Sequence, residues 1–420
     1  MKSRPEDDPV TLAGFASLSK KGHAVSMSAD ISTRPSCVSA EIEGNRLHLI
    51  DTGPERLSEL LYLIGSARHY LKLYFYMFES DDYGQWVMDR LLDALHRGIA
   101  VTLMIDSFGS SNADLRFFQP FQDAGGRFGV FGNRRSTRYL IRNHQKIAIA
   151  DGKRMLTGGF NISKHYFGTP EDNAWRDLGL YLEGPQVAEA ERWFDALADW
   201  VMAPKQRYSA LRRLIRFWPK REGTLTWLLG GPVRLSPWTQ AVKHDLERGT
   251  RCDMVQAYFS PSRGMLRRLT ALGMRGDVRL VTASKSDNTT TIAAARWLYA
   301  RLIRNRVKIY EFLPCKLHMK LIVVDDIVYV GSANFDMRSL FINLELMLRI
   351  KNAAFADQIR AFIDRDVKDC QEITQELHRR RTGPFTRLLG WISYGMVSVV
   401  DYTVTRRLNF PAHMRDVDDD

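Results

Sequence analysis

Short apolar runs alternate with longer amphipathic segments from about residue 45 onward. Short apolar runs are typical of buried strands, whereas apolar residues spaced three and four apart are typical of helices that bury one face. The alternation therefore predicts an α/β fold with a parallel or mixed sheet covered by helices. The predicted strands are 46–50, 71–77, 99–105 and 178–182, and later 252–259, 278–282, 307–312 and 343–350.

Helical spacing fills the intervals between these strands. The predicted helices are 55–66, 82–97, 187–201, 265–272, 289–305 and 353–370. In the third of them Trp193 and Trp200 are seven residues apart and share one face. We expect these two side chains in the protein core and not at a lipid surface. The order of strands and helices in the first half recurs in the second, which indicates an internal duplication.

A polar motif occurs once in each half. It consists of His, any residue, Lys, four residues, Asp, a short hairpin, then Gly, Gly or Ser, any residue and Asn. The first copy comprises His144, Lys146, Asp151, Gly158, Gly159 and Asn161, and the second comprises His318, Lys320, Asp325, Gly331, Ser332 and Asn334. Gly159 replaces the serine of the second copy, so a hydroxyl that could bind phosphate is missing from the first.

The motif places three kinds of polar group on one face of a sheet. Side chains two apart on a strand share a face and lie about 7 Å apart, so His and Lys point the same way. The glycine-containing turn then brings Asn back beside them. Two facing copies would supply two imidazoles, two ammonium groups and two amides. Such a set suits a phosphodiester, because cations and amides hold the oxygens while one His attacks and the other handles protons.

The doubled motif resembles the phospholipase D superfamily, and five flanking stretches point to its cardiolipin synthase branch. These stretches are 74–79, 105–110, 175–177, 334–339 and 343–345. The resemblance runs from about residue 45 to about residue 370. It implies two tandem phospholipase D-like domains, each a mixed β-sheet flanked by helices. The domains would be related by a pseudo-twofold axis, with one active site at their interface and no cofactor or metal.

The resemblance also assigns roles to the motif residues. His144 would attack phosphorus to form a phosphohistidine, and His318 would move the proton. The phosphoryl oxygens would be held by Lys146, Lys320, Asn161 and Asn334, with Gly159 and Ser332 also at the substrate. Asp177 and Glu345 would orient the two imidazoles. Asp151 and Asp325 belong to the catalytic motif, although their position at strand ends favours a structural role.

The implied reaction makes cardiolipin from phosphatidylglycerol and a second phospholipid and releases glycerol. Two other phospholipase D-type reactions stay open, namely lipid hydrolysis and nucleic-acid cleavage. A non-catalytic membrane scaffold is a further alternative, although a scaffold has no need for either motif histidine. One chain holds both half-sites, so a monomer suffices for one active site.

The composition adds an expectation about the partner. The chain has 420 residues and a formal net charge of +12, which favours an anionic partner. We expect anionic phospholipids and a membrane surface, and no nucleic acid. The four cysteines are scattered and no histidine cluster has ligand spacing, so we expect reduced thiols and no metal. No signal peptide or stretch of 18 apolar residues is seen, which predicts a peripheral protein on the cytoplasmic face of the cell membrane.

The chain divides into five predicted regions. They are a mobile tail (1–44), the first domain (45–204), a basic aromatic linker (205–245), the second domain (246–378) and an amphipathic C-terminal tail (379–420). The linker interleaves Arg and Lys with Trp and Phe over 205–238, a composition that suits lipid headgroups and the acyl boundary. The C-terminal stretch 388–400 lacks charge, and we expect it to lie in a membrane interface or against the catalytic body.

Overall fold

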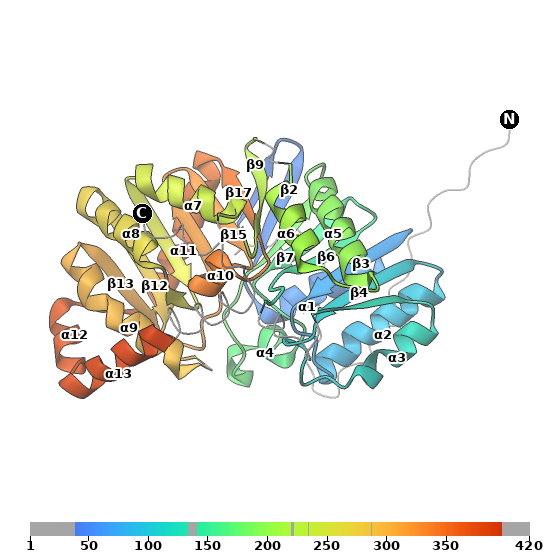
Figure 1. Cartoon of the computed structure of the whole chain (residues 1–420), viewed down its shortest axis with the longest axis horizontal. Coiled ribbons are helices and arrows are strands. Elements are labelled where there is room, and N and C mark those ends of the chain that lie inside the picture. The colour runs from blue at the N-terminus through green and yellow to red at the C-terminus, as the bar shows by residue number, and fades with distance from the viewer. Residues whose placement is uncertain (1–37, 133–140, 220–221, 234, 287, 397–420) are drawn as a thin grey trace. The chain divides into compact units, whose positions relative to one another are not determined.

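The computed structural model describes residues 38–132, 141–219, 222–233, 235–286 and 288–396. All of them fall in one compact unit, Pro35–Asp420. Two eight-stranded sheets form its framework, one in each half of the chain (Figure 1). The α/β expectation is therefore confirmed, and both sheets are mixed.

The first sheet has the strand order β1-β2-β8-β7-β6-β3-β4-β5. Strands β3, β4 and β5 are parallel to one another, whereas β6, β7, β8 and β2 are joined by antiparallel pairs. The strands are β1 Ser39–Ile42, β2 Asn45–Ile50, β3 Tyr70–Phe75, β4 Ala100–Asp106, β5 Arg127–Phe131, β6 Lys146–Ala150, β7 Arg154–Gly158 and β8 Gly179–Glu183.

The first two helices of the first half begin at residues that cap them. Thr52 caps α1 and Asp81 caps α2 through side-chain bonds to backbone amides. The helices are α1 Gly53–Gly65, α2 Asp82–His96, α3 Gln119–Asp123, α4 Lys164–Phe167, α5 Val187–Met202 and α6 Tyr208–Arg216, with 3₁₀ turns at Leu115–Phe118 and Pro170–Asp172.

The second sheet has the order β18-β13-β12-β10-β14-β15-β17-β9, in which the seven strands from β13 to β9 correspond to β5 through β2 of the first sheet, whereas β18 and β1 are extra edge strands at opposite edges. Its strands are β9 Leu225–Gly230, β10 Arg251–Gln256, β12 Asp277–Ala283, β13 Val307–Phe312, β14 Lys320–Val324, β15 Ile327–Gly331, β17 Glu345–Lys351 and β18 Cys370–Glu372, and a separate pair joins β11 Phe259–Ser260 to β16 Phe335–Asp336. The helices are α7 Pro237–Arg248, α8 Arg263–Arg275, α9 Thr289–Arg304, α10 Met337–Phe341, α11 Ala353–Val367, α12 Gln375–Arg381 and α13 Pro384–Tyr394.

One hydrophobic core joins the two halves. It contains side chains of β6 and β8 from the first sheet, of β14, β15 and β17 from the second, and of helices α5 and α11. Trp193 is 1% exposed and Trp200 is 8% exposed within this core, so the expectation of core tryptophans is confirmed. A second core lies between the other face of the second sheet and helices α7, α8 and α9.

The interpretation of 205–245 as a linker is wrong for most of its length. Strand β9 is the edge strand of the second sheet and pairs with β17, just as β2 pairs with β8 in the first sheet. Trp227 and Leu229 of β9 are buried, and so are Leu211 and Ile215 of α6. These apolar side chains are therefore not available to a lipid surface. Strand β9 was not predicted, because the arginines and lysines that flank it are typical of a membrane-interface segment.

Smaller differences concern element ends. Residues 39–42 of the expected tail form β1, which pairs with β2, and helix 353–370 stops at Val367 before strand β18. Predicted strand 252–259 is divided, because β10 ends at Gln256 and β11 begins at Phe259. The rest of the predicted tail, 1–37, and residues 397–420 lie outside the described part of the chain. Among the described residues, no helix has the length and apolar character needed to cross a bilayer.

The burial of β9 predicts unequal effects of two substitutions in the same segment. Trp227→Ala removes a side chain that is 5% exposed and whose indole N–H donates to the Gln186 carbonyl at 3.0 Å. We expect a loss of about 3–5 kcal/mol in the free energy of unfolding, measured by chemical denaturation. Phe217→Ala is the matched control, because Phe217 is 70% exposed. It should change stability by less than about 0.5 kcal/mol, and equal small effects would contradict the core assignment of β9.

Candidate active site

Two reciprocal backbone bridges bring the two motifs together. The His144 amide donates to the Leu344 carbonyl at 2.8 Å, and the Leu344 amide donates to the Arg142 carbonyl at 2.9 Å. In the same way the His318 amide donates to the Arg176 carbonyl at 2.7 Å. Each motif histidine thus pairs through its backbone with the residue that precedes an acidic residue of the other half.

Each imidazole contacts a carboxylate from the opposite half. Nδ1 of His144 lies 3.2 Å from Oε2 of Glu345, which begins β17. Nδ1 of His318 lies 2.7 Å from Oδ2 of Asp177, which immediately precedes β8. The two contacts are related by the duplication and both acidic side chains are fully buried. Neither half of the chain therefore holds a complete histidine–carboxylate pair.

These contacts fix the tautomer of both rings. Nδ1 of His144 also lies 3.1 Å from the Ser332 carbonyl oxygen, so both of its neighbours are acceptors. Nδ1 must therefore carry the proton, and Nε2 keeps its lone pair. The Lys320 ammonium lies 2.7 Å from Nδ1 of His318, but Nδ1 cannot both donate to Asp177 and accept from Lys320. We infer that Nδ1 of His318 keeps its proton and donates it in a hydrogen bond to Asp177, since this contact matches the one between His144 and Glu345.

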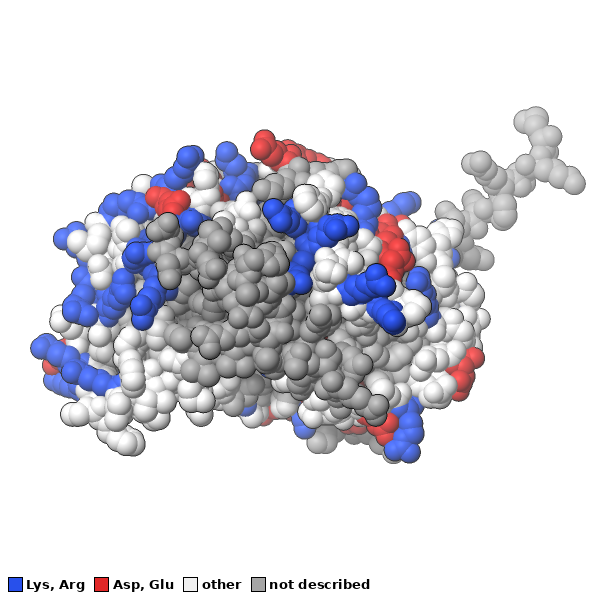
Figure 2. Space-filling view, viewed as in Figure 1, with Lys and Arg blue, Asp and Glu red and all other residues white. Residues whose placement is uncertain are grey.

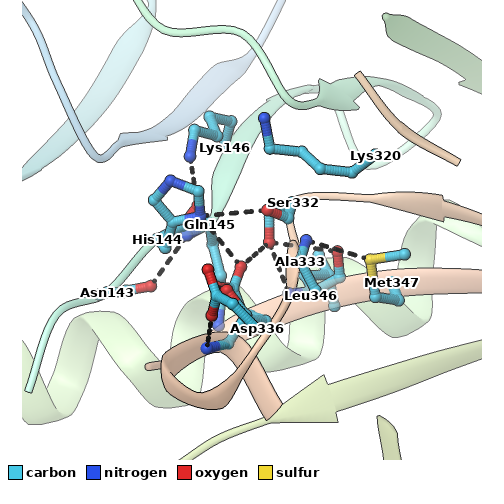
Figure 3. Close-up of polar contacts among 12 residues, drawn as sticks. Asn143, His144, Gln145, Lys146, Lys320, Ser332, Ala333, Asp336, Leu346 and Met347 are labelled. Atoms are coloured by element: carbon cyan, nitrogen blue, oxygen red, sulfur yellow. Dashed lines mark hydrogen bonds and ion pairs between the residues drawn. The ribbon is translucent and has the colours of Figure 1, made fainter. Parts of the chain in front are cut away.

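The two lysines of the motifs are buried beside the rings. The Lys146 ammonium donates to the His144 carbonyl at 2.5 Å, and the Lys320 ammonium donates to the His318 carbonyl. Both side chains reach toward the region of the His144 ring, Lys146 from β6 and Lys320 from β14 (Figure 3). Burial, opposed by the negative charge of Glu345, lowers the pKa of Lys146 well below its ordinary value. A site that holds two buried ammonium groups attracts an anion.

Burial also sets the charge of the histidines. The pKa of His144 is lowered to about 4, first by burial and then by the Lys146 ammonium. The pKa of His318 is lowered to about 4 by burial and by Lys320. Although burial alone would raise the pKa of Asp177, Lys320 and His318 hold it below its ordinary value. At neutral pH the free site therefore contains two neutral imidazoles beside ionised Asp177.

The motif glycines are explained by close approach of the backbone. Gly158 has φ +142°, and a Cβ there would lie 2.3 Å from the Leu178 carbonyl oxygen. Gly331 has φ +157°, and a Cβ there would lie 2.2 Å from the Leu346 carbonyl oxygen. Both glycines end the second strand of their hairpin against the strand that follows the carboxylate. Any larger residue would push that carboxylate away from its histidine.

Gly159 and Ser332, which occupy the same position in the two copies, differ because of the carboxylates beside them. The Ser332 hydroxyl donates to Oε2 of Glu345, so it orients a carboxylate and is not directed at phosphate. In the first copy, a Cβ on Gly159 would lie 2.3 Å from Oδ1 of Asp177. The shorter aspartate thus occupies the space that serine fills in the second copy. Substrate binding by these two positions stays a prediction, whereas the contacts present in the structure place the two carboxylates.

The two motif asparagines have different surroundings. The Asn161 side-chain oxygen accepts from the Met77 amide at 3.2 Å, which ties the motif to the loop after β3. Oδ1 of Asn334 is buried and has no hydrogen-bond partner. Asn334 is 4% exposed, so this oxygen is shielded from solvent. The two copies therefore differ in their amides as well as in their carboxylates.

The motif aspartates lie at the far ends of their strands and are not with the histidines. Asp151 accepts from the backbone amides of Arg68, His69 and Tyr70 at 2.8–3.0 Å. Asp325 does the same for the loop before β10, with Thr250 and Arg251 as donors. The inclusion of Asp151 and Asp325 among the catalytic residues stays a prediction, whereas these backbone contacts fit the structural role favoured by their position at strand ends.

Sequence reasoning missed several residues that support the site. Arg56 of α1 is fully buried and donates to the carbonyl oxygens of Asp177 and Tyr166 at 2.6 and 2.7 Å. The Ser339 hydroxyl donates to Oε1 of Glu345 at 2.7 Å. Ser339 lies in stretch 334–339 and Tyr76 lies in stretch 74–79, so the family resemblance pointed to both residues. It did not indicate which side chains they contact. Nothing in the helical pattern around Arg56 marks it, because its partners are more than one hundred residues away.

Aromatic rings enclose the two imidazoles. Tyr76 meets His144 edge-on with ring centroids 4.9 Å apart. Tyr166 and Trp175 lie 5.2 and 5.1 Å from His318. These rings exclude water and leave the side chains of His144 and His318 12% and 6% exposed. Within the described ranges, no group of three or more His, Cys, Asp or Glu side chains is arranged to hold a metal ion.

Comparison with known proteins identifies the family. The sequence model of the family described as cardiolipin synthase, PLD-like domain matches residues 60–198 and 243–367. This is more than half of the chain, and each segment contains one copy of the motif. The chain therefore belongs to this family and is a phospholipase D-type enzyme.

Curated relatives and solved structures agree with this assignment. Cardiolipin synthase A of Pseudomonas entomophila is 29% identical over 346 residues, which are 80% of this chain and 71% of the relative. Cardiolipin synthase 1 of Staphylococcus aureus is 28% identical over 359 residues, with 81% and 71% coverage. Phosphatidylserine synthase of Haemophilus influenzae aligns with a TM-score of 0.68, 13% identity and coverage of 88% of this chain and 96% of its own. That last similarity shows a shared fold.

The crowding at Gly159 predicts that making the two copies alike will damage the site. We expect Gly159→Ser and Gly159→Ala to reduce turnover of a chromogenic phosphodiester at least about tenfold, because the new Cβ displaces Asp177 from His318. Gly223→Ser is a matched control, since a Cβ there meets only the Leu225 carbonyl oxygen at 3.5 Å. Full activity of Gly159→Ser would mean that the hydroxyl is tolerated and that the crowding argument is wrong.

The burial of His144 predicts an unusual titration. In protein labelled with ¹³C at histidine, the His144 resonance should stay in its neutral form between pH 8 and pH 5, because its pKa is about 4. The missing resonance in His144→Gln assigns the peak. A midpoint near the ordinary value of about 6.5 would show that the ring is solvated and would contradict the buried site.

Proposed function

We propose that this enzyme transfers a phosphatidyl group from phosphatidylglycerol to the hydroxyl of a second phospholipid. The product is cardiolipin and the released alcohol is glycerol. The proposal rests on one observation above all, the pair of buried histidines that each contact a carboxylate of the other half. The family and the names of the curated relatives support the choice of lipid substrates.

In the first step, His144 attacks the phosphorus of the donor lipid. Its Nε2 lone pair forms the P–N bond while the bond from phosphorus to the glycerol oxygen breaks. The leaving oxygen takes a proton from Nε2 of His318, so glycerol departs as a neutral alcohol. Glu345 stabilises the positive charge that develops on His144, as an oriented carboxylate does beside a catalytic imidazole.

In the second step, the hydroxyl of the acceptor lipid attacks the phosphohistidine. Its proton goes to Nε2 of His318 while the P–N bond to His144 breaks. Lys146 and Lys320 balance the negative charge on the phosphoryl oxygens in both transition states.

His318 must carry a proton when glycerol leaves, and the negative charge of the substrate explains how it can. In the free site the pKa of His318 is about 4, so His318 is neutral at pH 7 and has no proton to give. Much of that shift comes from burial and from the Lys320 ammonium. A phosphodiester anion bound between the lysines offsets their charge and so raises the pKa of His318. Substrate binding therefore prepares the acid.

The choice between transfer and hydrolysis depends on which acceptor reaches the phosphohistidine. The rings of Tyr76, Tyr166 and Trp175 and the low exposure of both histidines limit access of water. This favours a lipid alcohol as acceptor. Phosphatidic acid as the main product would instead identify a hydrolase.

The roles of the two histidines can be separated with two donors. We expect His144→Ala and His318→Ala each to lower cardiolipin formation from phosphatidylglycerol at least about a thousandfold, measured by mass spectrometry of the lipid products. With a fluorescent phosphatidyl-p-nitrophenol, whose leaving group needs no proton, His318→Ala should still acquire a covalent label that survives alkaline quenching and is lost in acid, as expected for a P–N bond. His144→Ala should acquire none. The reverse pattern would make His318 the nucleophile, and no lipid product from the wild type would reject the proposed function.

A further inference from the structure

Helix α13 leaves its apolar stripe exposed, partly to solvent and partly to a groove that it shares with α9. Phe385, Leu388, Leu389 and Ile392 lie three or four residues apart, so they share one face of the helix. They are 41–76% exposed. The buried positions of the helix are Gly390, Ser393 and Tyr394. An ordinary surface helix has the opposite arrangement, because its apolar stripe faces the core.

The helix is held firmly in this orientation. Tyr394 stacks on Trp297 of α9 with ring centroids 4.9 Å apart, and its hydroxyl donates to the Pro261 carbonyl at 3.1 Å. Gly390 allows close contact, since a Cβ there would lie 3.1 Å from Cβ of Trp297. Residues 388–396, the described part of the predicted stretch 388–400, therefore pack against the catalytic body. They do so through one face of the helix only. The apolar stripe is presented to the outside by a fixed contact.

Exposed apolar side chains are concentrated in this helix. Of the fourteen large hydrophobic residues with high exposure in the described chain, six lie between Phe385 and Met396. Trp391 is 58% exposed and flanks the stripe. An apolar patch of this kind on a folded protein marks a surface that is covered by a partner.

Cations border the same surface. Helix α12 ends in Arg379, Arg380 and Arg381, and Arg387 lies within α13. An open groove of about 1370 Å³ runs between α9 and α13, and Arg301 and Arg304 are among its lining residues. Figure 2 shows Lys and Arg side chains next to a broad uncharged area at the end of the protein where Figure 1 places α12 and α13.

We propose that α13 and its arginine border dock on the surface of an anionic lipid bilayer. The apolar stripe and Trp391 enter the boundary between headgroups and acyl chains, and Arg379 and Arg387 contact lipid phosphates, whereas Arg380 and Arg381 pair with Glu376 and Glu311. The helix lies in the plane of the interface, since its eleven residues are too short to span a bilayer. The inference rests on the proposed function only in the sense that a lipid enzyme must reach lipids.

A bilayer fits this surface better than a second copy of the chain does. A second copy of the chain would bring the same apolar stripe and the same positively charged border to the interface, and α13 carries no acidic side chain to match those charges. An anionic membrane supplies the opposite charge and an apolar interior together.

The test measures binding to vesicles in a His144→Ala background, so that the lipid composition does not change during the experiment. Full-length protein is sedimented with vesicles of phosphatidylcholine with or without phosphatidylglycerol. We expect Leu388→Glu/Ile392→Glu to weaken partitioning at least about tenfold on both kinds of vesicle, because two anchors are lost. Arg379→Gln/Arg387→Gln should weaken binding only to vesicles that contain phosphatidylglycerol, and added salt should mimic it.

Leu115→Glu/Met274→Glu is the matched control. Leu115 and Met274 are 58% and 50% exposed and lie in other elements, so the same change of charge should leave partitioning unchanged. Thermal unfolding of each variant verifies that it is folded. Unchanged vesicle binding by Leu388→Glu/Ile392→Glu would overturn the proposal. So would conversion of a dimer to a monomer by that variant with vesicle binding intact, which would identify a second copy as the partner.

The two proposals fail in different ways. Vesicle binding that depends on α13, without any phosphatidyl transfer by the wild type, would reject the enzyme function and leave the docking surface in place. Transfer in detergent-dispersed lipid, with vesicle binding that does not depend on α13, would do the reverse.

Discussion

The site depends on one constraint: each motif histidine is oriented by a carboxylate from the other half of the chain. An imidazole is useful in this chemistry only if one nitrogen is occupied and the other is free. Here the occupying carboxylate always comes from the other half, and backbone bridges beside each histidine fix its distance. The shared core of β6, β8, β14, β15 and β17 is what holds these bridges in register. Packing far from the reacting atoms thus determines the charge and direction of the two rings.

Much of the fold was predictable because its patterns are local. Strands β6 and β14, which begin at Lys146 and Lys320 just after the motif histidines, are apolar runs, and the duplication made each copy support the other. Strand β9 was missed because burial of Trp227 depends on pairing with β17, more than one hundred residues away. Its neighbouring charges suggested a membrane surface, whereas the surface that does expose apolar side chains is α13.

The site divides in the same way. The residue types of the motif, and the pairing of Asp177 and Glu345 with the histidines, were expected from the family resemblance. The support from Arg56 and the crowding between Gly159 and Asp177 were not, since both depend on atoms that meet only in the folded chain. Asp151 illustrates the converse case, a motif residue whose partners are three backbone amides at the opposite end of its strand.

The unequal pairs Gly159–Asp177 and Ser332–Glu345 have a consequence for the history of the molecule. If a single half formed the same site as a symmetric dimer, one gene would encode both copies and every substitution would appear twice. A change suited to one histidine would then be imposed on the other as well. When both halves lie in one polypeptide, each copy can change independently of the other. The short acid beside a glycine and the long acid beside a serine are the kind of divergence that becomes accessible only after such a fusion.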